Sequence, residues 1–119
     1  MEFLWTTLTV MDIERSLKFY QEVIGLPLKG RFNPPGLQIA FLGEGETAVE
    51  LIQDAKVPVV DLRSPITLGF KVDQLEAAME ALKAKVVAIE AGPYQPAPST
   101  RFFYFRDPDG MRIQFVERK

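Results

Sequence analysis

The sequence predicts an α+β fold built from two βαβββ modules in tandem. Each half of the 119-residue chain contains one stretch of alternating polar and apolar residues, followed by one amphipathic helical segment. Three more stretches typical of strands follow in each half, separated by turns rich in Gly, Pro, Asn and Asp. Because this order occurs twice, we expect a single domain over residues 1–119, with modules at about residues 1–53 and 65–119 joined by a linker.

The first half begins with a predicted strand over residues 3–10, where polar and apolar residues alternate. Asp12 is the expected N-cap of a helix over about residues 13–24, which Gly25 and Pro27 end. The apolar stripe of this helix consists of Ile13, Leu17, Tyr20 and Ile24. Further strands are predicted at about residues 28–32, 38–42 and 48–53, with a hairpin turn at residues 43–46.

The second half repeats this order of elements. A strand over residues 66–72 precedes a helix over residues 74–83, with Asp73 as its expected N-cap. The turn before the last strand has the sequence Asp107-Pro108-Asp109-Gly110. The other predicted segments are a strand at residues 86–90, a Pro-rich loop at 91–98, and strands at 100–106 and 111–117.

The composition argues against several kinds of partner. The 14 basic and 16 acidic residues give a formal net charge of -2, so no basic surface for nucleic acid is expected. No apolar stretch approaches the ~20 residues that span a bilayer, and the first residues lack the basic region of a signal peptide. We therefore expect a soluble, cytoplasmic protein that binds neither nucleic acid nor membrane.

The chain contains no cysteine and no histidine. This composition excludes disulfides and thiolate nucleophiles, and it removes imidazole, the most common protein ligand of transition metals. Any catalysis must therefore use carboxylates, Lys, Arg, Tyr or hydroxyl groups.

Period-two alternation divides four of the predicted strands, the first and the last of each half, between a core face and a second face. In the first strand the second face carries Phe3, Trp5, Thr7 and Thr9, a mixture that suits the lining of a pocket. Glu50 and Gln114 occupy equivalent central positions in the last strand of each half. A polar side chain between apolar neighbours costs free energy unless it is paired, and a ligand is one possible partner.

Two segments resemble a known family. Residues 7–20, followed by Val23-Ile24-Gly25-Leu26, resemble the opening strand and helix of glyoxalase-like proteins. Residues 105–114, with their Asp-Pro-Asp-Gly turn, resemble the last hairpin of the same proteins. The chain is thereby identified as a member of the vicinal oxygen chelate (VOC) superfamily of glyoxalases, bleomycin resistance proteins and dioxygenases. The resemblance implies a cupped mixed sheet with helices outside, and a homodimer whose cup forms within one chain or across two.

Superfamily members typically hold a divalent metal in the cup with His or Glu side chains. The resemblance places the four ligand positions at Trp5, Glu50, Thr67 and Gln114, of which only Glu50 has a side chain that binds divalent metals well. We therefore expect no metal and no cofactor. Metal-dependent glyoxalase I chemistry and extradiol dioxygenase chemistry are not expected either.

Three functional hypotheses follow. The first is metal-independent binding of a small, partly aromatic or apolar molecule in the cup, as in the resistance-type branch, with candidate ligand contacts at Trp5, Thr7, Thr67, Phe103 and Gln114. The second is a lyase or isomerase in which Glu50 is the general base beside Gln114, with Tyr104 as a further candidate. The third is a structural or interaction module whose cup is filled by side chains such as Trp5.

Each candidate also has a purely structural interpretation. Trp5 could fill the core, Glu50 could pair with a basic residue, and Thr67 could be an ordinary strand residue. The aromatic run at residues 102–105 must place rings on both faces of its strand, and Phe103 is our candidate for the cup. Arg101 and Arg112 are either surface charges or anion-binding groups.

Overall fold

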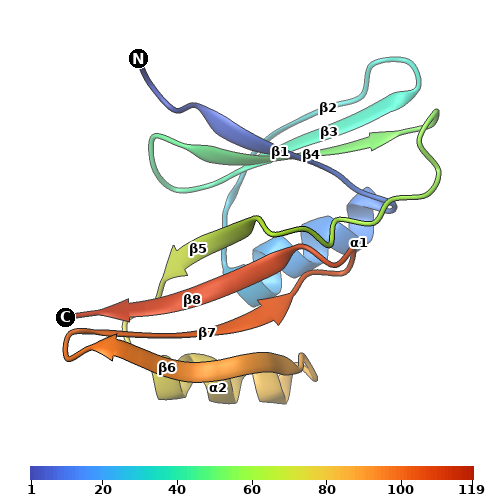
Figure 1. The fold of residues 1–119 in the computed structure, drawn as a ribbon. Helices are drawn as coiled ribbons and strands as arrows, with labels where there is room; N and C mark the ends of the chain where they lie inside the picture. The colour runs from blue at the N-terminus through green and yellow to red at the C-terminus, as the bar shows by residue number, and fades with distance from the viewer. The chain divides into compact units, whose positions relative to one another are not determined.

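The computed structural model describes residues 1–119, which separate into two compact units. We call Met1–Leu62 the first module and Arg63–Lys119 the second module. Each module contains one four-stranded mixed sheet and one helical segment, in the order βαβββ (Figure 1). The predicted α+β class with two modules in tandem is therefore confirmed. Neither helix has the length and apolar character needed to cross a membrane.

The first module begins with β1 (Trp5–Thr9), α1 (Ile13–Lys18) and a π-helical continuation, η1 (Phe19–Ile24). Three strands follow, namely β2 (Leu28–Phe32), β3 (Leu37–Leu42) and β4 (Ala48–Asp54). The sheet order is β1-β4-β3-β2, in which β1 is parallel to β4 and the other pairs are antiparallel. The expected helix over residues 13–24 is thus present, although its second half is wound as a π-helix.

The second module repeats this arrangement with β5 (Thr67–Lys71), α2 (Leu75–Ala84), β6 (Ile89–Ala97), β7 (Thr100–Arg106) and β8 (Arg112–Arg118). Its sheet order is β5-β8-β7-β6, with β5 parallel to β8. The parallel pair therefore joins the first and last strands of each module, as β1 and β4 do in the first.

The predicted Pro-rich loop at residues 91–98 is wrong, because β6 runs from Ile89 to Ala97. This strand lies at the edge of the sheet and its register with β7 shifts repeatedly. Proline has no backbone N–H to donate, so a sheet tolerates it on an edge strand or at a bulge. The prolines that suggested a loop are therefore compatible with an irregular edge strand.

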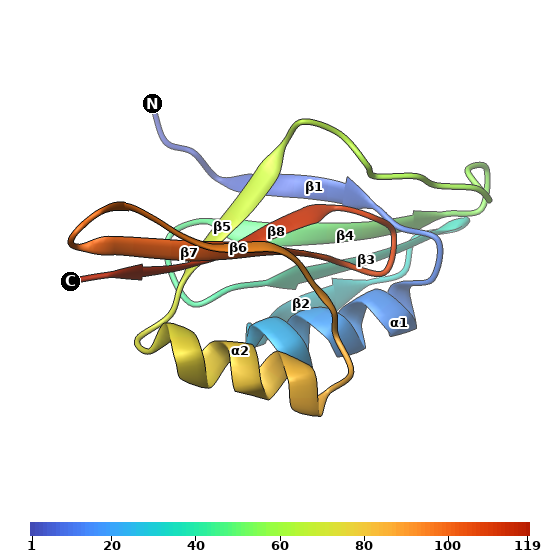
Figure 2. The same cartoon turned by 60° about the horizontal axis from the view of Figure 1, so that its bottom comes forward.

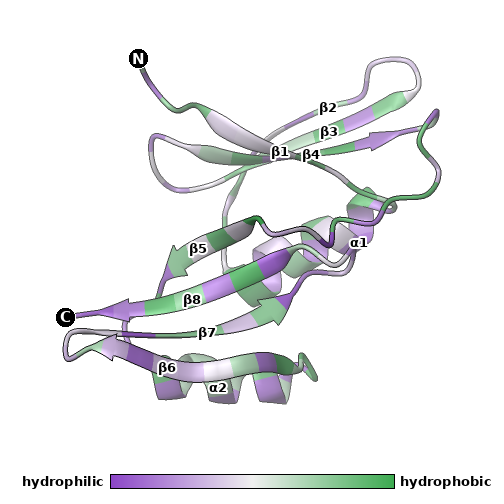
Figure 3. Ribbon diagram, viewed as in Figure 1, coloured by the Kyte–Doolittle hydropathy of each residue, from purple (hydrophilic) through white to green (hydrophobic).

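The core of each module lies between one face of the sheet and the module's own helix. Figure 2 shows each helix on one side of its sheet, and the alternation of polar and apolar residues is visible along β8 in Figure 3. In the first module the fully buried side chains include Val10, Ile13, Tyr20, Leu42 and Leu51. In the second they include Leu75, Leu82, Phe103, Phe105 and Ile113. We call the opposite face of each sheet the helix-free face.

A side chain from the last strand binds the first helical N–H in both modules. Gln53 Oε1 accepts a hydrogen bond from Ile13 N at 2.9 Å, and Glu117 Oε2 accepts one from Leu75 N at 2.8 Å. The first N–H groups of a helix have no partner within the helix, and the N-terminal dipole favours an anionic acceptor. These bonds attach each helix to its sheet.

The two predicted N-caps have different outcomes. Asp12 is the N-cap of α1, and its Oδ1 accepts hydrogen bonds from Glu14 N at 3.1 Å and Arg15 N at 3.2 Å. The predicted cap at Asp73 is wrong, since Gln74 is the N-cap of α2 and makes no side-chain capping bond. The buried carboxylate of Glu117 supplies the acceptor instead.

The Asp-Pro-Asp-Gly turn between β7 and β8 is confirmed. Asp107 Oδ1 accepts hydrogen bonds from Asp109 N at 2.8 Å and Met111 N at 2.9 Å. Gly110 has a φ of 94°, a left-handed conformation that favours glycine. The turn sets the register in which Arg106 and Arg112 face each other across the two strands.

Replacing Glu117 should reveal the contribution of this capping contact to stability. We expect Glu117→Ala to lower the free energy of unfolding by about 1–3 kcal/mol, because it leaves the buried Leu75 N–H without its acceptor. Urea unfolding followed by circular dichroism measures the change. Arg118→Ala, at an exposed position of the same strand, is the control and should change stability by no more than about 0.5 kcal/mol. Equal effects of the two substitutions would contradict a capping role.

Candidate functional site

The parallel pairing of β1 and β4 brings Thr7 and Glu50 together. The two residues are register partners, and Thr7 Oγ1 donates a hydrogen bond to Glu50 Oε1 at 2.5 Å. Their neighbours Leu8 and Leu51 point to the helix-covered face and are buried. Glu50 is half-buried on the helix-free face, with one carboxylate oxygen held by the threonine hydroxyl.

An aromatic cluster adjoins this pair. The ring centroids of Trp5 and Phe41 are 5.3 Å apart, and those of Phe41 and Phe32 are 6.2 Å apart, both with edge-to-face geometry. These rings line a pocket of about 410 Å³, together with Leu4, Lys29, Gly30, Glu46 and Ala48. Phe41 is the register partner of Glu50 on β3, so the pocket and the carboxylate share one surface. Trp5 is 46% exposed and is therefore not a core residue in this chain.

The helix-free face of the second module carries a positively charged side chain, that of Arg112. Arg112 Nε donates a hydrogen bond to Thr67 Oγ1 at 2.5 Å, and its guanidinium carbon lies 4.6 Å from the ring centroid of Tyr104. Gln114 is on the same face and its Nε2 lies 3.5 Å from Tyr104 Oη. Gly69 is the register partner of Gln114, and a Cβ atom at Gly69 would lie 3.3 Å from Gln114 Oε1. The glycine thus leaves room for the glutamine side chain.

Phe103 does not lie with the other candidates. It is completely buried on the helix-covered face, with its ring centroid 5.8 Å from that of Phe105 and 5.7 Å from that of Phe115. Alternation along β7 instead places Phe102 and Tyr104 on the helix-free face. The sequence showed that the rings must divide between the faces, but the choice depended on which face the helix covers.

Several aromatic residues near the candidates were missed. Tyr94 of β6 packs beside Phe102 and Tyr104, with ring centroids 5.8 Å and 6.3 Å away. It was assigned to a loop because of the flanking prolines. Phe32 and Phe41 were assigned to strands, and the alternation of those strands, extended to the second face, would have placed them beside Trp5.

Arg106 and Glu90 form an ion pair on the second module. Arg106 donates to both Glu90 carboxylate oxygens, from Nε at 2.5 Å and from Nη2 at 2.9 Å. The hydrogen bond from Arg106 lowers the pKa of the Glu90 carboxyl, and the charges of Arg106 and Arg112 act in the same direction. The pair therefore stabilises the fold at pH values above the ordinary pKa of a carboxyl group. This contribution to the free energy of unfolding is lost as the pH falls through the lowered pKa. Because both groups are partly exposed, the contribution is small.

The donor groups do not fit a divalent metal. Glu50 is the only carboxylate at the four ligand positions, and Thr7 already occupies one of its oxygens. Thr67 Oγ1 accepts from the guanidinium of Arg112, whose positive charge repels a cation. No cluster of three or more carboxylates occurs that could hold an ion. The chemistry of these side chains therefore argues against the metal centre that the superfamily resemblance implies.

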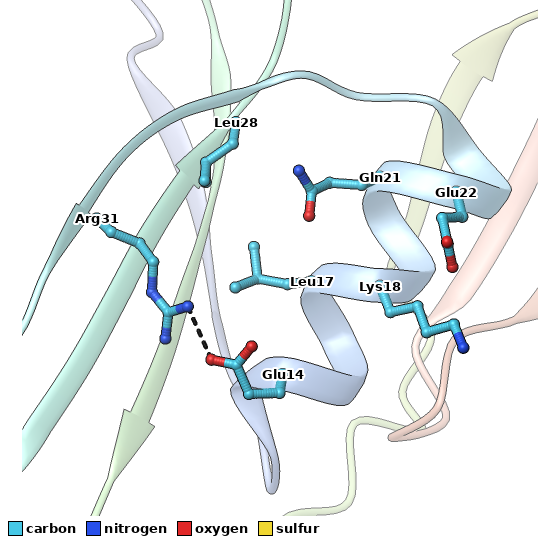
Figure 4. A pocket seen from close by; sticks show the side chains of 7 residues that line it. All are labelled: Glu14, Leu17, Lys18, Gln21, Glu22, Leu28 and Arg31. Carbon is cyan, nitrogen blue, oxygen red and sulfur yellow. Dashed lines mark ion pairs between the residues drawn. The ribbon is translucent and has the colours of Figure 1, made fainter.

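A second hollow of about 410 Å³ lies beside the helix of the first module (Figure 4). It is lined by Glu14, Leu17, Lys18, Gln21, Glu22, Leu28 and Arg31. Arg31 Nη1 and Glu14 Oε1 are paired at 2.7 Å across it. The lining mixes both signs of charge and has no aromatic ring, so it offers less for an organic ligand than the pocket beside Trp5.

Comparison with known proteins identifies relatives over the whole chain. The chain is 37% identical to a protein named lactoylglutathione lyase from Haemophilus influenzae, over 100% of this chain and 94% of the relative. A protein of the same name from Neisseria meningitidis is 34% identical over 100% of this chain and 92% of that protein.

Solved structures share the fold. Glyoxalase I from Zea mays matches with a TM-score of 0.86 and 28% identity, over 98% of this chain. The match spans only 44% of the maize chain, so the present chain corresponds to less than half of that protein. An antibiotic-binding protein from Streptomyces sp. CB03234 matches with a TM-score of 0.80 over 100% of this chain and 97% of its own, but its 24% identity indicates the fold alone.

The family model described as Glyoxalase/Bleomycin resistance protein/Dioxygenase superfamily matches residues 2–115, nearly the whole chain. The duplicated βαβββ order, the Asp-Pro-Asp-Gly turn and the structural matches agree with this assignment. The chain therefore belongs to the Glyoxalase/Bleomycin resistance protein/Dioxygenase superfamily.

Proposed function

We propose that this protein binds a small organic molecule on the helix-free face of the first module, without a divalent metal. The observation that carries the proposal is the pocket formed by Trp5, Phe41 and Phe32 beside the Thr7–Glu50 pair. Aromatic walls with few polar groups are typical of sites for planar or apolar ligands. The carboxylate beside them would orient a donor group of the ligand.

The donor set supports the metal independence that we propose. One hydrogen-bonded carboxylate, a tryptophan, a threonine next to a guanidinium and a glutamine amide do not form a site for zinc or nickel. Ligand affinity should therefore depend on contacts with the protein alone.

Trp5 is the only tryptophan of the chain and is a built-in reporter of binding. We expect planar apolar members of a metabolite and drug panel to change its fluorescence and to raise the melting temperature, with no effect of EDTA. Trp5→Ala should weaken the binding of such a ligand about tenfold or more, measured by calorimetry, because it removes one wall of the pocket.

Val59→Ala is the control for this experiment, because it shortens another exposed apolar side chain of the same module outside the pocket. Its affinity should match that of the unmodified protein. The proposal fails if no panel member binds, or if EDTA abolishes binding.

A second function is favoured by the names of the relatives. The chain is 37% identical to a protein named lactoylglutathione lyase, over 94% of that protein. In this alternative the chain is a lyase or isomerase of the glyoxalase-like group, and Glu50 is the general base. The hydrogen bond from Thr7 would hold one carboxylate oxygen, which leaves the other for a substrate proton.

Glu50→Gln separates the two functions, because the substitution removes the base and largely preserves the shape of the side chain. If the protein has lactoylglutathione lyase activity, the variant should lose about 100-fold or more in kcat. The pH-rate profile of the unmodified protein should show an acidic limb from a carboxyl group. Thr7→Val is the companion variant and should cause a smaller loss.

Unchanged turnover in Glu50→Gln would exclude Glu50 as the general base. No turnover by the unmodified protein, together with ligand binding to both proteins, would leave binding as the function.

The superfamily resemblance also implies a homodimer, which we propose for this chain. Light scattering coupled to size-exclusion chromatography should then give twice the 13.4 kDa mass of the chain. A mass of one chain at all concentrations would contradict it.

A further inference from the structure

We propose that Arg112, fixed by Thr67 and Tyr104 on the helix-free face of the second module, binds the carboxylate of a small organic acid. The inference goes beyond the proposed function, since it assigns a separate site for an anionic ligand to the second module. Three features carry it: the geometry of the guanidinium, the charges around it and the rings beside it.

The guanidinium of Arg112 is held at two points. Its Nε donates to Thr67 Oγ1 at 2.5 Å, and its guanidinium carbon lies over the ring of Tyr104, 4.6 Å from the ring centroid. Neither Nη atom has a hydrogen-bond or ion-pair partner within the chain. The edge formed by the two Nη atoms is therefore a fixed pair of donors with no acceptor from the protein.

The neighbouring Arg106 binds a carboxylate of the protein through two donors, Nε and Nη2. Arg106 and Arg112 are register partners on β7 and β8, so two positive side chains lie directly opposite each other. Both carboxylate oxygens of Glu90 accept hydrogen bonds from Arg106, at 2.5 Å and 2.9 Å. Like charges at opposite positions of a strand pair destabilise a sheet. Glu90 makes hydrogen bonds with Arg106 but not with Arg112. A second carboxylate at Arg112 would complete the charge balance.

The contrast extends to the opposite face of the same strand. Arg101 of β7 is paired with Glu76 at 2.6 Å and lies 3.9 Å from Glu117. On both faces of β7 the arginines therefore have acidic partners within the protein, whereas Arg112 of β8 has none.

The size of the charge and the shape of the donor edge favour a carboxylate over a phosphate. Two parallel N–H groups match the two oxygens of a planar carboxylate, whose single charge one guanidinium neutralises. A phosphate monoester carries nearly two negative charges at neutral pH and would require a second free cation. Arg106 is not free, because Glu90 binds it.

The rings beside Arg112 indicate the rest of the ligand. Tyr94, Phe102 and Tyr104 form a cluster with ring centroids 5.5–6.3 Å apart. Tyr94 is 48% exposed, so the cluster is accessible to a ligand. An aromatic or unsaturated acid would place its carboxylate on Arg112 and its apolar part on these rings.

Benzoate and benzamide test the proposal because they have nearly the same shape and differ in charge. The experiment uses the full chain labelled with nitrogen-15 arginine. NMR follows the Nε–Hε signals, and calorimetry gives the affinity of each variant. We expect benzoate to shift the Arg112 signal saturably, and benzamide to bind at least about tenfold more weakly. Phenyl phosphate should also bind more weakly than benzoate.

Three substitutions locate the site. Arg112→Gln should weaken benzoate binding about tenfold or more, and Thr67→Val several-fold, because it frees the guanidinium to rotate. Arg112→Lys keeps the charge, loses the paired donors and should also bind several-fold more weakly. Arg118→Gln is the matched control: it removes the same charge from an exposed position of the same strand, about 20 Å away, and should leave affinity within about twofold.

The proposal is overturned if benzoate leaves the Arg112 signal unchanged, if benzamide binds equally well, or if Arg112→Gln and Arg118→Gln have the same effect. Equal binding by Arg112→Lys would overturn the paired-donor geometry. Neutral panel members that bind at Trp5, with no effect of benzoate at Arg112, would leave the proposed function standing and remove the anion site. Benzoate binding through Arg112, with no panel ligand at Trp5, would leave the anion site standing and remove the proposed function of the Trp5 pocket.

Discussion

The parallel pairing of the first and last strands is the constraint on which each module depends. It aligns Thr7 with Glu50 in the first sheet and Gly69 with Gln114 in the second. Because the connecting helix covers one face of each sheet, these side chains remain on the other face. The same pairing brings Gln53 and Glu117 beneath the starts of the two helices, where they bind the first helical N–H groups. Helix attachment and site residues therefore come from alternate positions of the same strands.

The two modules use equivalent positions in opposite ways. In the first, Trp5 faces Ala48 across the parallel pair, and the large ring joins Phe41 beside a carboxylate. In the second, Thr67 faces Arg112, so the large side chain comes from the last strand and carries a positive charge. The same backbone arrangement thus presents aromatic rings beside the carboxylate of Glu50 in the first module. In the second it presents the guanidinium of Arg112 beside the amide of Gln114. Neither combination offers the set of imidazole and carboxylate groups that transition metals prefer.

The errors in prediction have a common cause. A cap at Asp73, a loop at residues 91–98 and a ligand contact at Phe103 were each inferred from local sequence. The structure replaces them with a carboxylate from β8, an irregular edge strand and a core residue. Each outcome depends on which strand lies beside which and on which face the helix covers, and these are not properties of a short segment.

The sequence by itself determined the α+β class, the repeated βαβββ order and the absence of imidazole and thiolate chemistry. These features depend on periodicity, turn residues and composition, all of which are local. Only the tertiary structure decided that Glu50 is held by Thr7, that Trp5 belongs to an exposed aromatic cluster, and that Arg112 lacks an acidic partner. Those facts depend on register between strands distant in the chain. Register is set by the packing of a whole sheet against its helix.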